Sequence, residues 1–258
     1  MSDIVLKNKP LVETIFEVKW ALTSLSPGIE VDPHYQILLG RFFDRVSPDY
    51  PEHEKLAAAT IPDEIVGQAV QHRFRIGSDD WPLLQIGPGI MSVNETHKYT
   101  WSDFRSRSLD AISKLFDSYP ALEELKINNL LLRYIDAVKF DSISENILEF
   151  LKDKMKVELN LPSELFEGTG IYYNPHQFNW QSSFVCENPQ GTVIARFATG
   201  HREGRPSLIW ETIVQSSGKD VPAMPNKFEE WLESAHNITH NWFFKLIEGD
   251  LEREFRGD

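Results

Sequence analysis

Cysteine, long apolar runs and hydrolase motifs are scarce or missing in this chain. Its 258 residues include one cysteine, Cys186, which excludes an intramolecular disulfide and an all-cysteine metal site. The Gly-x-Ser-x-Gly motif of hydrolases is absent. No apolar run has the length of a membrane span, and the first residues lack the basic and apolar regions of a signal peptide. We therefore expect a soluble, cytoplasmic protein with no cofactor and no membrane partner.

Basic residues are also few relative to acidic ones. The chain has 26 Lys and Arg against 39 Asp and Glu, a formal net charge of -13, and the acidic excess is present in both halves. Because phosphate neutralisation needs clustered basic side chains, this composition argues against a broad nucleic-acid-binding face. It is compatible with a basic protein partner or with solubility alone.

Apolar and aromatic residues are plentiful. Hydrophobic residues make up 41% of the chain and aromatic residues 12%, a composition that supplies a substantial core and argues against disorder. At this length the chain can form one large domain or two intimate halves.

The stretch from Leu11 to Trp20 alternates with the period of a β-strand. Its opposite face carries the charged residues Glu13, Glu17 and Lys19. The face that we expect helices to cover carries Val12, Thr14, Phe16, Val18 and Trp20. A second strand of this type is predicted at Leu130–Phe140.

Hydrophobic periodicity and turn residues predict the remaining elements. Residues 49–67 are compatible with a short helix or an extended connector. Helices are predicted at Asp32–Val46, beginning at an Asp32-Pro33 cap, at about 100–119 with Thr100 or Ser102 at its start, at 144–156 with Ser144 as the cap, and at 226–254. Further strands are predicted at 70–76, 82–86, 90–94, 178–186, 192–198 and 207–215.

This order of elements suggests an internal duplication. Residues 1–125 and 126–258 each read as strand, helix, three strands and helix. We predict an α+β fold in which the duplicated halves form one intimate unit, a curved antiparallel sheet with helices on one face. The architecture resembles the saddle of TATA-box-binding proteins as a fold analogy, which carries no implication of DNA binding.

Several short motifs together resemble a sporadically distributed family of uncharacterised bacterial proteins of similar length. Asp136 stands where we expect asparagine in that family. The resemblance implies a mobile or defence-related gene cluster and brings no activity with it. The motifs are Lys9-Pro10-Leu11-Val12-Glu13-x-x-Phe16-Glu17-Val18, Gln85-x-Gly87-Pro88-Gly89, Tyr99-x-Trp101-x-x-Phe104, Leu132-Arg133-Tyr134-Ile135 and His236…Phe244.

Charged residues on the predicted strands suggest a ligand or partner face. Such a cluster could bind a polar ligand or act as acid and base. The alternative is a solvated sheet face with cross-strand ion pairs. No catalytic residue is assigned. The candidate face comprises Glu13, Glu17, Arg73, Arg75, Arg133, Tyr134 and Asp136.

Three other motifs favour structural roles. His236 and His240 share a helix face, but Asn237 stands where a zinc hydrolase needs glutamate, so we predict no metal site. Gly87-Pro88-Gly89 lies between strands and predicts a hairpin turn rather than a phosphate loop. The basic stretch Gly200–Pro206 is interpreted as a charged hairpin, with anion contact as the alternative.

Two hypotheses for the function follow. The first is a non-catalytic, acidic binding or regulatory protein, antitoxin-like or accessory in a mobile or phage-defence gene cluster, with a protein partner and the possibility of a homo-oligomer. The second is an enzyme or small-ligand sensor with a polar pocket between the halves, lined by Glu13, Glu17, Arg133 and Tyr134. A buried cavity with converging charges would favour the second, and an open, hydrophobic-rimmed sheet face would favour the first.

Overall fold

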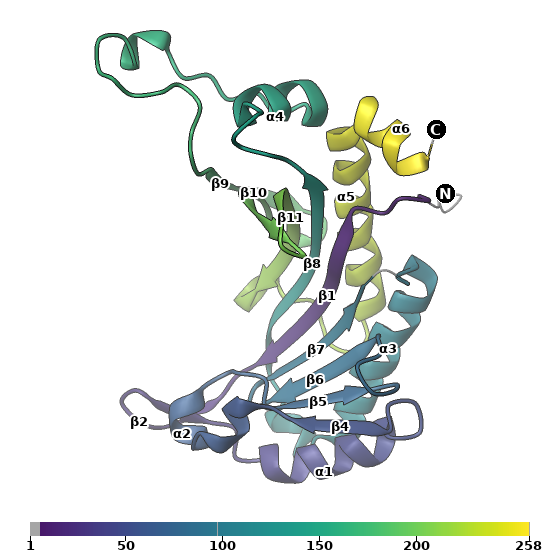
Figure 1. Ribbon diagram of the computed structural model, residues 1–258. Helices are drawn as coiled ribbons and strands as arrows, with labels where there is room; N and C mark the ends of the chain where they lie inside the picture. The colour runs from purple at the N-terminus through teal and green to yellow at the C-terminus, as the bar shows by residue number, and fades with distance from the viewer. Residues whose placement is uncertain (1–5, 97, 258) are drawn as a thin grey trace.

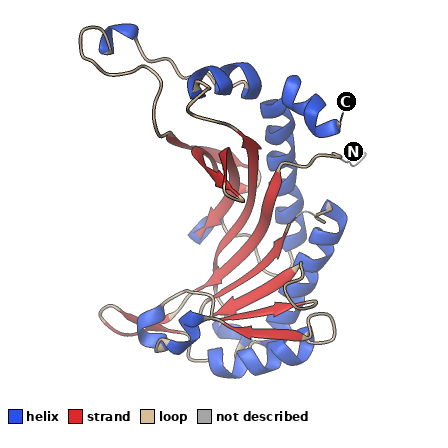
Figure 2. Ribbon diagram, in the orientation of Figure 1, coloured by secondary structure: helices blue, strands red, loops and turns tan. Residues whose placement is uncertain are grey.

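The computed structural model describes residues 6–96 and 98–257. Within these ranges, nine strands form one sheet in the order β4-β5-β6-β7-β1-β8-β11-β10-β9, with every neighbouring pair antiparallel (Figures 1 and 2). The predicted mixture of helices with a large antiparallel sheet is confirmed, whereas the internal duplication stays a prediction. The strands of this sheet are β1 (Leu11–Trp20), β4 (Glu52–Lys55), β5 (His72–Arg75), β6 (Leu83–Gly87), β7 (Ile90–Glu95), β8 (Ile127–Lys139), β9 (Asn179–Glu187), β10 (Gln190–Arg202) and β11 (Arg205–Ser217).

The two long predicted strands, β1 and β8, pair with each other in the middle of the sheet. Thr14, Phe16, Val18 and Trp20 are fully buried on one face of β1, as their alternation predicts. The prediction for Val12 was wrong. The pairing register shifts between Leu11 and Glu13, and this irregularity turns Leu11 into the buried face.

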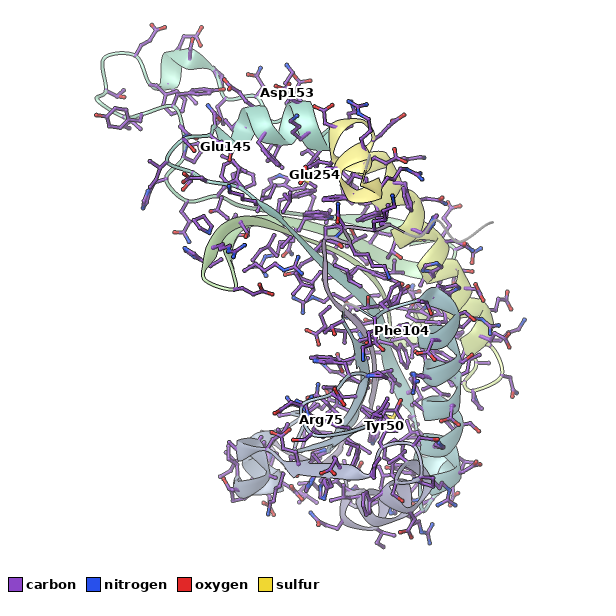
Figure 3. All side chains as sticks on the ribbon, turned by 45° about the vertical axis from the view of Figure 1, so that its right-hand side comes forward. Tyr50, Arg75, Phe104, Glu145, Asp153 and Glu254 are labelled. Atoms are coloured by element: carbon purple, nitrogen blue, oxygen red, sulfur yellow. The ribbon has the colours of Figure 1, made fainter. Side chains whose placement is uncertain are left out.

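Six α-helices accompany the sheet in the described part of the chain. The sheet is curved, and α3 and α5 run side by side along its convex face (Figure 3). Arg105 of α3 pairs with Glu229 and Glu233 of α5, which ties the two helices together. The helices are α1 (Tyr35–Val46), α2 (Asp63–Val66), α3 (Trp101–Ser118), α4 (Ile147–Met155), α5 (Phe228–Ile247) and α6 (Asp250–Arg256).

The core beneath these helices consists of two hydrophobic clusters. The first lies around β1, β7, α1 and α3 and includes Phe16 and Phe104. The second lies around β10, β11, α4 and α6 and includes Phe140 and Leu251. Trp242 of α5 packs against both clusters. Helix α5 therefore spans the region where the two clusters meet.

Several predicted boundaries differ from the structure. The segment that sequence left open contributes the edge strand β4, the short helix α2 and a 3-10 turn at Ala57–Thr60, while β2 (Thr23–Ser26) and β3 (Ile29–Val31) form a separate hairpin. The prediction of a single long last helix was wrong. It breaks at Gly249, whose φ of 113° is incompatible with a continuous helix.

Two predicted helix caps were also wrong. Asn146 rather than Ser144 caps α4, because its side chain accepts hydrogen bonds from the backbone N–H groups of Leu148 and Glu149. Asp32 is buried, and its carboxylate accepts hydrogen bonds from Trp20 Nε1 (2.8 Å) and the Tyr119 hydroxyl (3.0 Å). Asp32 therefore holds the segment before α1 in place and is not the cap of that helix.

The predicted hairpins at Gly87-Pro88-Gly89 and at Gly200–Pro206 are both present, and the second has a shorter turn than predicted. Gly87 pairs with Ile90 across the β6–β7 turn, and a Cβ on Gly87 would lie 1.9 Å from the Ala69 carbonyl oxygen, so a larger residue cannot stand there. The β10–β11 connection is a two-residue turn, Glu203-Gly204, in which both residues have positive φ. The basic stretch is therefore mostly strand, and its residues belong to the sheet.

Candidate functional site

A cavity of about 190 Å³ lies between the sheet and helices α3 and α5. Its walls come from the segment before β1, from β1, β8 and β11, and from the start of α3 and the middle of α5. Leu6 and Phe243 belong to the second hydrophobic cluster, whereas Trp101 and Tyr134 pack against the first. The cavity is thus the gap that remains where two separately packed clusters meet.

A row of polar groups runs along one wall of this cavity. The hydroxyl oxygens of Tyr99 and Tyr134 are 2.7 Å apart, and the Tyr134 hydroxyl lies 3.0 Å from Nδ1 of His236. Burial raises the pKa of the Tyr134 hydroxyl well above its usual value. The Tyr134 hydroxyl therefore stays protonated at neutral pH and connects the loop before α3 to α5 through the sheet.

His236 is held as a neutral, stacked ring. It lies flat against the Trp101 indole, with 3.6 Å between the ring centroids and 7° between the planes. Burial, reinforced by the neighbouring His240, lowers the pKa of His236 to about 3. At neutral pH this imidazole carries no charge, and its basicity is too low for general-base work.

Asp136 is the acidic group of the cavity. Its side chain is 4% exposed and lines the cavity, and no residue in the described ranges donates a hydrogen bond to its carboxyl group. Burial raises the pKa of Asp136 to about 8, against the opposing attraction of the Arg202 guanidinium. A buried carboxyl without a donor is unusual, and a strongly perturbed pKa in a cavity marks a candidate site.

The position of Asp136 follows from strand register. Tyr134 lies opposite Thr14 on β1 and Thr212 on β11, and Asp136 lies opposite Leu11 and Trp210. The hydroxyl of Thr14 and the indole nitrogen of Trp210 are buried without a hydrogen-bond partner among the described residues. Two of the six buried polar side-chain atoms that lack a partner among the described residues therefore lie on the strands next to Tyr134 and Asp136.

The other predicted site residues lie on the opposite, open face of the sheet. Arg133 pairs with Glu211 of β11 (2.7 Å), and Glu13 accepts a hydrogen bond from Asn94 Nδ2 (2.7 Å). Glu17 pairs with Lys19 on its own strand (3.1 Å). The structure therefore separates these residues from Tyr134 and Asp136 by the thickness of the sheet.

Arg73 and Arg75 lie far from the central strands, near the β4 edge. Both pair with Glu54 of β4, at 3.0 and 3.5 Å, and the Arg75 guanidinium lies over the Trp81 ring, 5.9 Å from its centroid. Of the seven predicted face residues, only Tyr134 and Asp136 are among the described residues that line the cavity.

Sequence reasoning missed most of the cavity wall. Tyr99 and Trp101 belong to a motif that was interpreted as a helix start, and His236 and His240 were interpreted as a structural pair. Two signals pointed to them: they recur in the motifs of the family resemblance, and the aromatic residues after His240 continue its helical face. Neither signal places α3 and α5 side by side over β8, which is what brings these residues together.

The site shows no arrangement of metal ligands. Among the described residues no group of three or more His, Cys, Asp or Glu side chains is placed to hold a metal ion.

None of the helices in the described part of the chain is both long and apolar enough to cross a bilayer. Comparison with protein-family models and with curated proteins found no match.

Proposed function

We propose that the protein binds a small molecule in this cavity and acts as a ligand sensor rather than an enzyme. The observation that carries the proposal is the buried carboxyl of Asp136, without a hydrogen-bond donor among the described residues, in a largely aromatic cavity of about 190 Å³. Convergent polar groups in an otherwise apolar, concave pocket are typical of small-molecule sites. The neutral His236, already engaged by Tyr134 and Trp101, supports binding over turnover.

A thermal-shift screen of small organic compounds tests this proposal. We expect hits that raise the melting temperature of the native chain and fail to do so for Thr239→Phe, which fills the cavity from α5. Thr212→Ile, which fills it from the sheet, serves as the second blocked variant if the first does not fold. The matched control is the double variant Glu13→Gln and Glu17→Gln on the open face, which keeps the response. Equal responses in blocked and native chains, or no hit at all, would refute the proposal.

A second candidate function is recognition of a protein partner, as in the antitoxin-like or defence-accessory role that the resemblance implies. It is supported by the segment 157–178 between α4 and β9, which extends away from the body of the protein (Figure 1). This segment exposes Ile171 (63%) and Tyr172 (89%). Exposed apolar groups of this size gathered on one segment are typical of interaction sites.

A pull-down from the native host tests this second function. We expect a stoichiometric protein partner with the native chain and its loss with the double variant Ile171→Ser and Tyr172→Ser. The Thr239→Phe variant should retain the partner, because the cavity lies elsewhere. Retention of the partner by the segment variant would argue against recognition through residues 157–178.

A further inference from the structure

The chemistry of the cavity restricts the class of ligand. Asp136 is the acidic group of the described wall, and the rest of the wall is dominated by aromatic rings from the loop before α3, from α3, from β8 and from α5: Tyr99, Trp101, Tyr134, Phe243 and Phe244. Aromatic faces attract cations when water is excluded, and a carboxylate supplies the opposite charge. The neutral imidazole of His236 adds no positive charge, so the positive charges near Asp136 among the described residues are those of Lys9 and Arg202.

The one lysine of the described cavity wall is already engaged. Lys9 Nζ donates a hydrogen bond to the Tyr99 carbonyl oxygen at 2.8 Å. Arg202 is likewise occupied, since its guanidinium donates to the carbonyl oxygens of Pro10 (3.0 Å) and Leu11 (3.3 Å). These contacts hold both cations to backbone oxygens and leave the Asp136 carboxyl without a donor among the described residues.

We infer that the cavity binds a small organic ammonium ion, a protonated amine on a compact apolar or aromatic group, with its N–H groups donating to the Asp136 carboxylate. This inference rests on the proposed sensor function. The apolar part of the ligand lies against Phe243 and Phe244. No covalent bond forms: the neutral Asp136 carboxyl loses its proton to the buffer as the ammonium enters, and an ion pair replaces the O–H group.

This exchange predicts a characteristic pH dependence. Because the pKa of Asp136 is raised to about 8, amine affinity increases about tenfold per pH unit below that value, is level between it and the pKa of the amine, and falls above the latter. A neutral hydrogen-bond acceptor shows the opposite trend, since it needs the protonated carboxyl. The other titratable or charged groups facing Asp136 are Lys9, Tyr99, Tyr134, His236, His240 and Arg202.

Titration calorimetry with three matched probes tests the inference: 2-phenylethylamine, 2-phenylethanol and 3-phenylpropionate. We expect the amine to bind at least about tenfold tighter than the other two at about pH 8, and to release close to one proton per molecule bound at about pH 7. Buffers of different ionisation enthalpy report that proton. His240→Gln should retain the pH dependence, whereas Asp136→Asn should lose it together with about tenfold or more of the affinity.

The outcomes distinguish a failure of the ammonium assignment from a failure of the sensor function. Tighter binding of the alcohol or the propionate, with affinity falling above about pH 8, overturns the ammonium assignment and leaves a small-molecule site in place. The same holds if none of the three probes binds and the hits of the thermal-shift screen are neutral or anionic. If neither the probes nor the screen yields a ligand sensitive to Thr239→Phe, the sensor function itself fails. Because the comparison of the three probes uses the native chain, it does not depend on the folding of Asp136→Asn.

Discussion

On the open face of the sheet Arg133 pairs with Glu211, whereas on the covered face of the same strand Asp136 lies in the cavity without a described donor. The two residues are three positions apart, and both were expected to contribute to one charged face. The first pair is partly exposed, through the Arg133 side chain, and its two charges compensate each other. Burial raises the pKa of the second carboxyl to about 8 and so favours its neutral form at pH 7.

The difference teaches that charge alone is a weak marker of a site in this protein. Glu13, Glu17, Arg73, Arg75 and Arg133 all have polar or charged partners nearby, as ordinary cross-strand networks do. The candidate site is identified instead by a buried carboxyl in a cavity, to which no described residue donates a hydrogen bond although the charge of Arg202 lies near it.

The largest expected effect comes from placing a new charge on the covered face of β8, compared with the same change on its open face. Leu132, fully buried on the covered face, and Leu131, half-buried on the open face, are adjacent and chemically identical. We expect Leu132→Asp to destabilise the fold by about 4 kcal/mol or more, and Leu131→Asp by about 1 kcal/mol. Chemical denaturation measures both. Equal losses would show that the open face is not solvated as described.

The next largest effect concerns the pH dependence of stability. Since burial raises the pKa of Asp136 to about 8, the folded chain keeps a proton between about pH 4 and pH 8 that the unfolded chain has lost, so this group makes stability fall as pH rises. Asp136→Asn removes that contribution. We expect its free energy of unfolding to rise relative to the native chain by up to about 1.4 kcal/mol per pH unit across this range.

The control for this measurement is Tyr134→Phe, which leaves the carboxyl in place and should keep the native slope. His236 contributes with the opposite sign: its pKa is lowered to about 3, so its contribution to stability increases with pH from about 3 to its ordinary value and then stays constant. A difference between Asp136→Asn and the native chain that does not change with pH would contradict the burial of this carboxyl as a neutral group.

A smaller effect follows from cutting the polar row along the cavity wall. Tyr134→Phe removes the hydroxyl that contacts both Tyr99 and His236. We expect a loss of about 1–2 kcal/mol, because a buried partner is left with an unmade hydrogen bond. Denaturation in urea measures it, with Tyr172→Phe on the exposed segment as a matched substitution of no consequence. An unchanged stability would mean that the row is not coupled to the fold.

The smallest expected effect is on the open face. A double-mutant cycle with Arg133→Gln and Glu211→Gln should give a coupling of about 0.5–1 kcal/mol. The Arg133 side chain is 32% exposed and the Glu211 side chain 11% exposed, so water screens the pair in part. High salt should weaken the coupling. A coupling of several kcal/mol that is insensitive to salt would instead assign this face a desolvated, functional pair.

Much of the scaffold was readable from local patterns. The alternation of β1, the turn at Gly87-Pro88-Gly89 and the start of α3 at Thr100, whose side chain accepts from Asp103 N–H, depend on residues close together in sequence. Sequence failed where distant contacts decide. The sequence around Asp32 predicts a helix cap, but its carboxylate accepts hydrogen bonds from Trp20 and Tyr119. The last helix breaks at a glycine, which helical periodicity alone does not reveal.

The sequence by itself determined most of the elements and the burial of one face of the central strands. Only the tertiary structure decided that this face meets Trp101 of α3 and His236 of α5 around a cavity. The physical reason is that strand alternation is a local property. The partners of a buried polar group are set by distant segments: Tyr99 lies 35 residues before Tyr134 and His236 lies 102 residues after it.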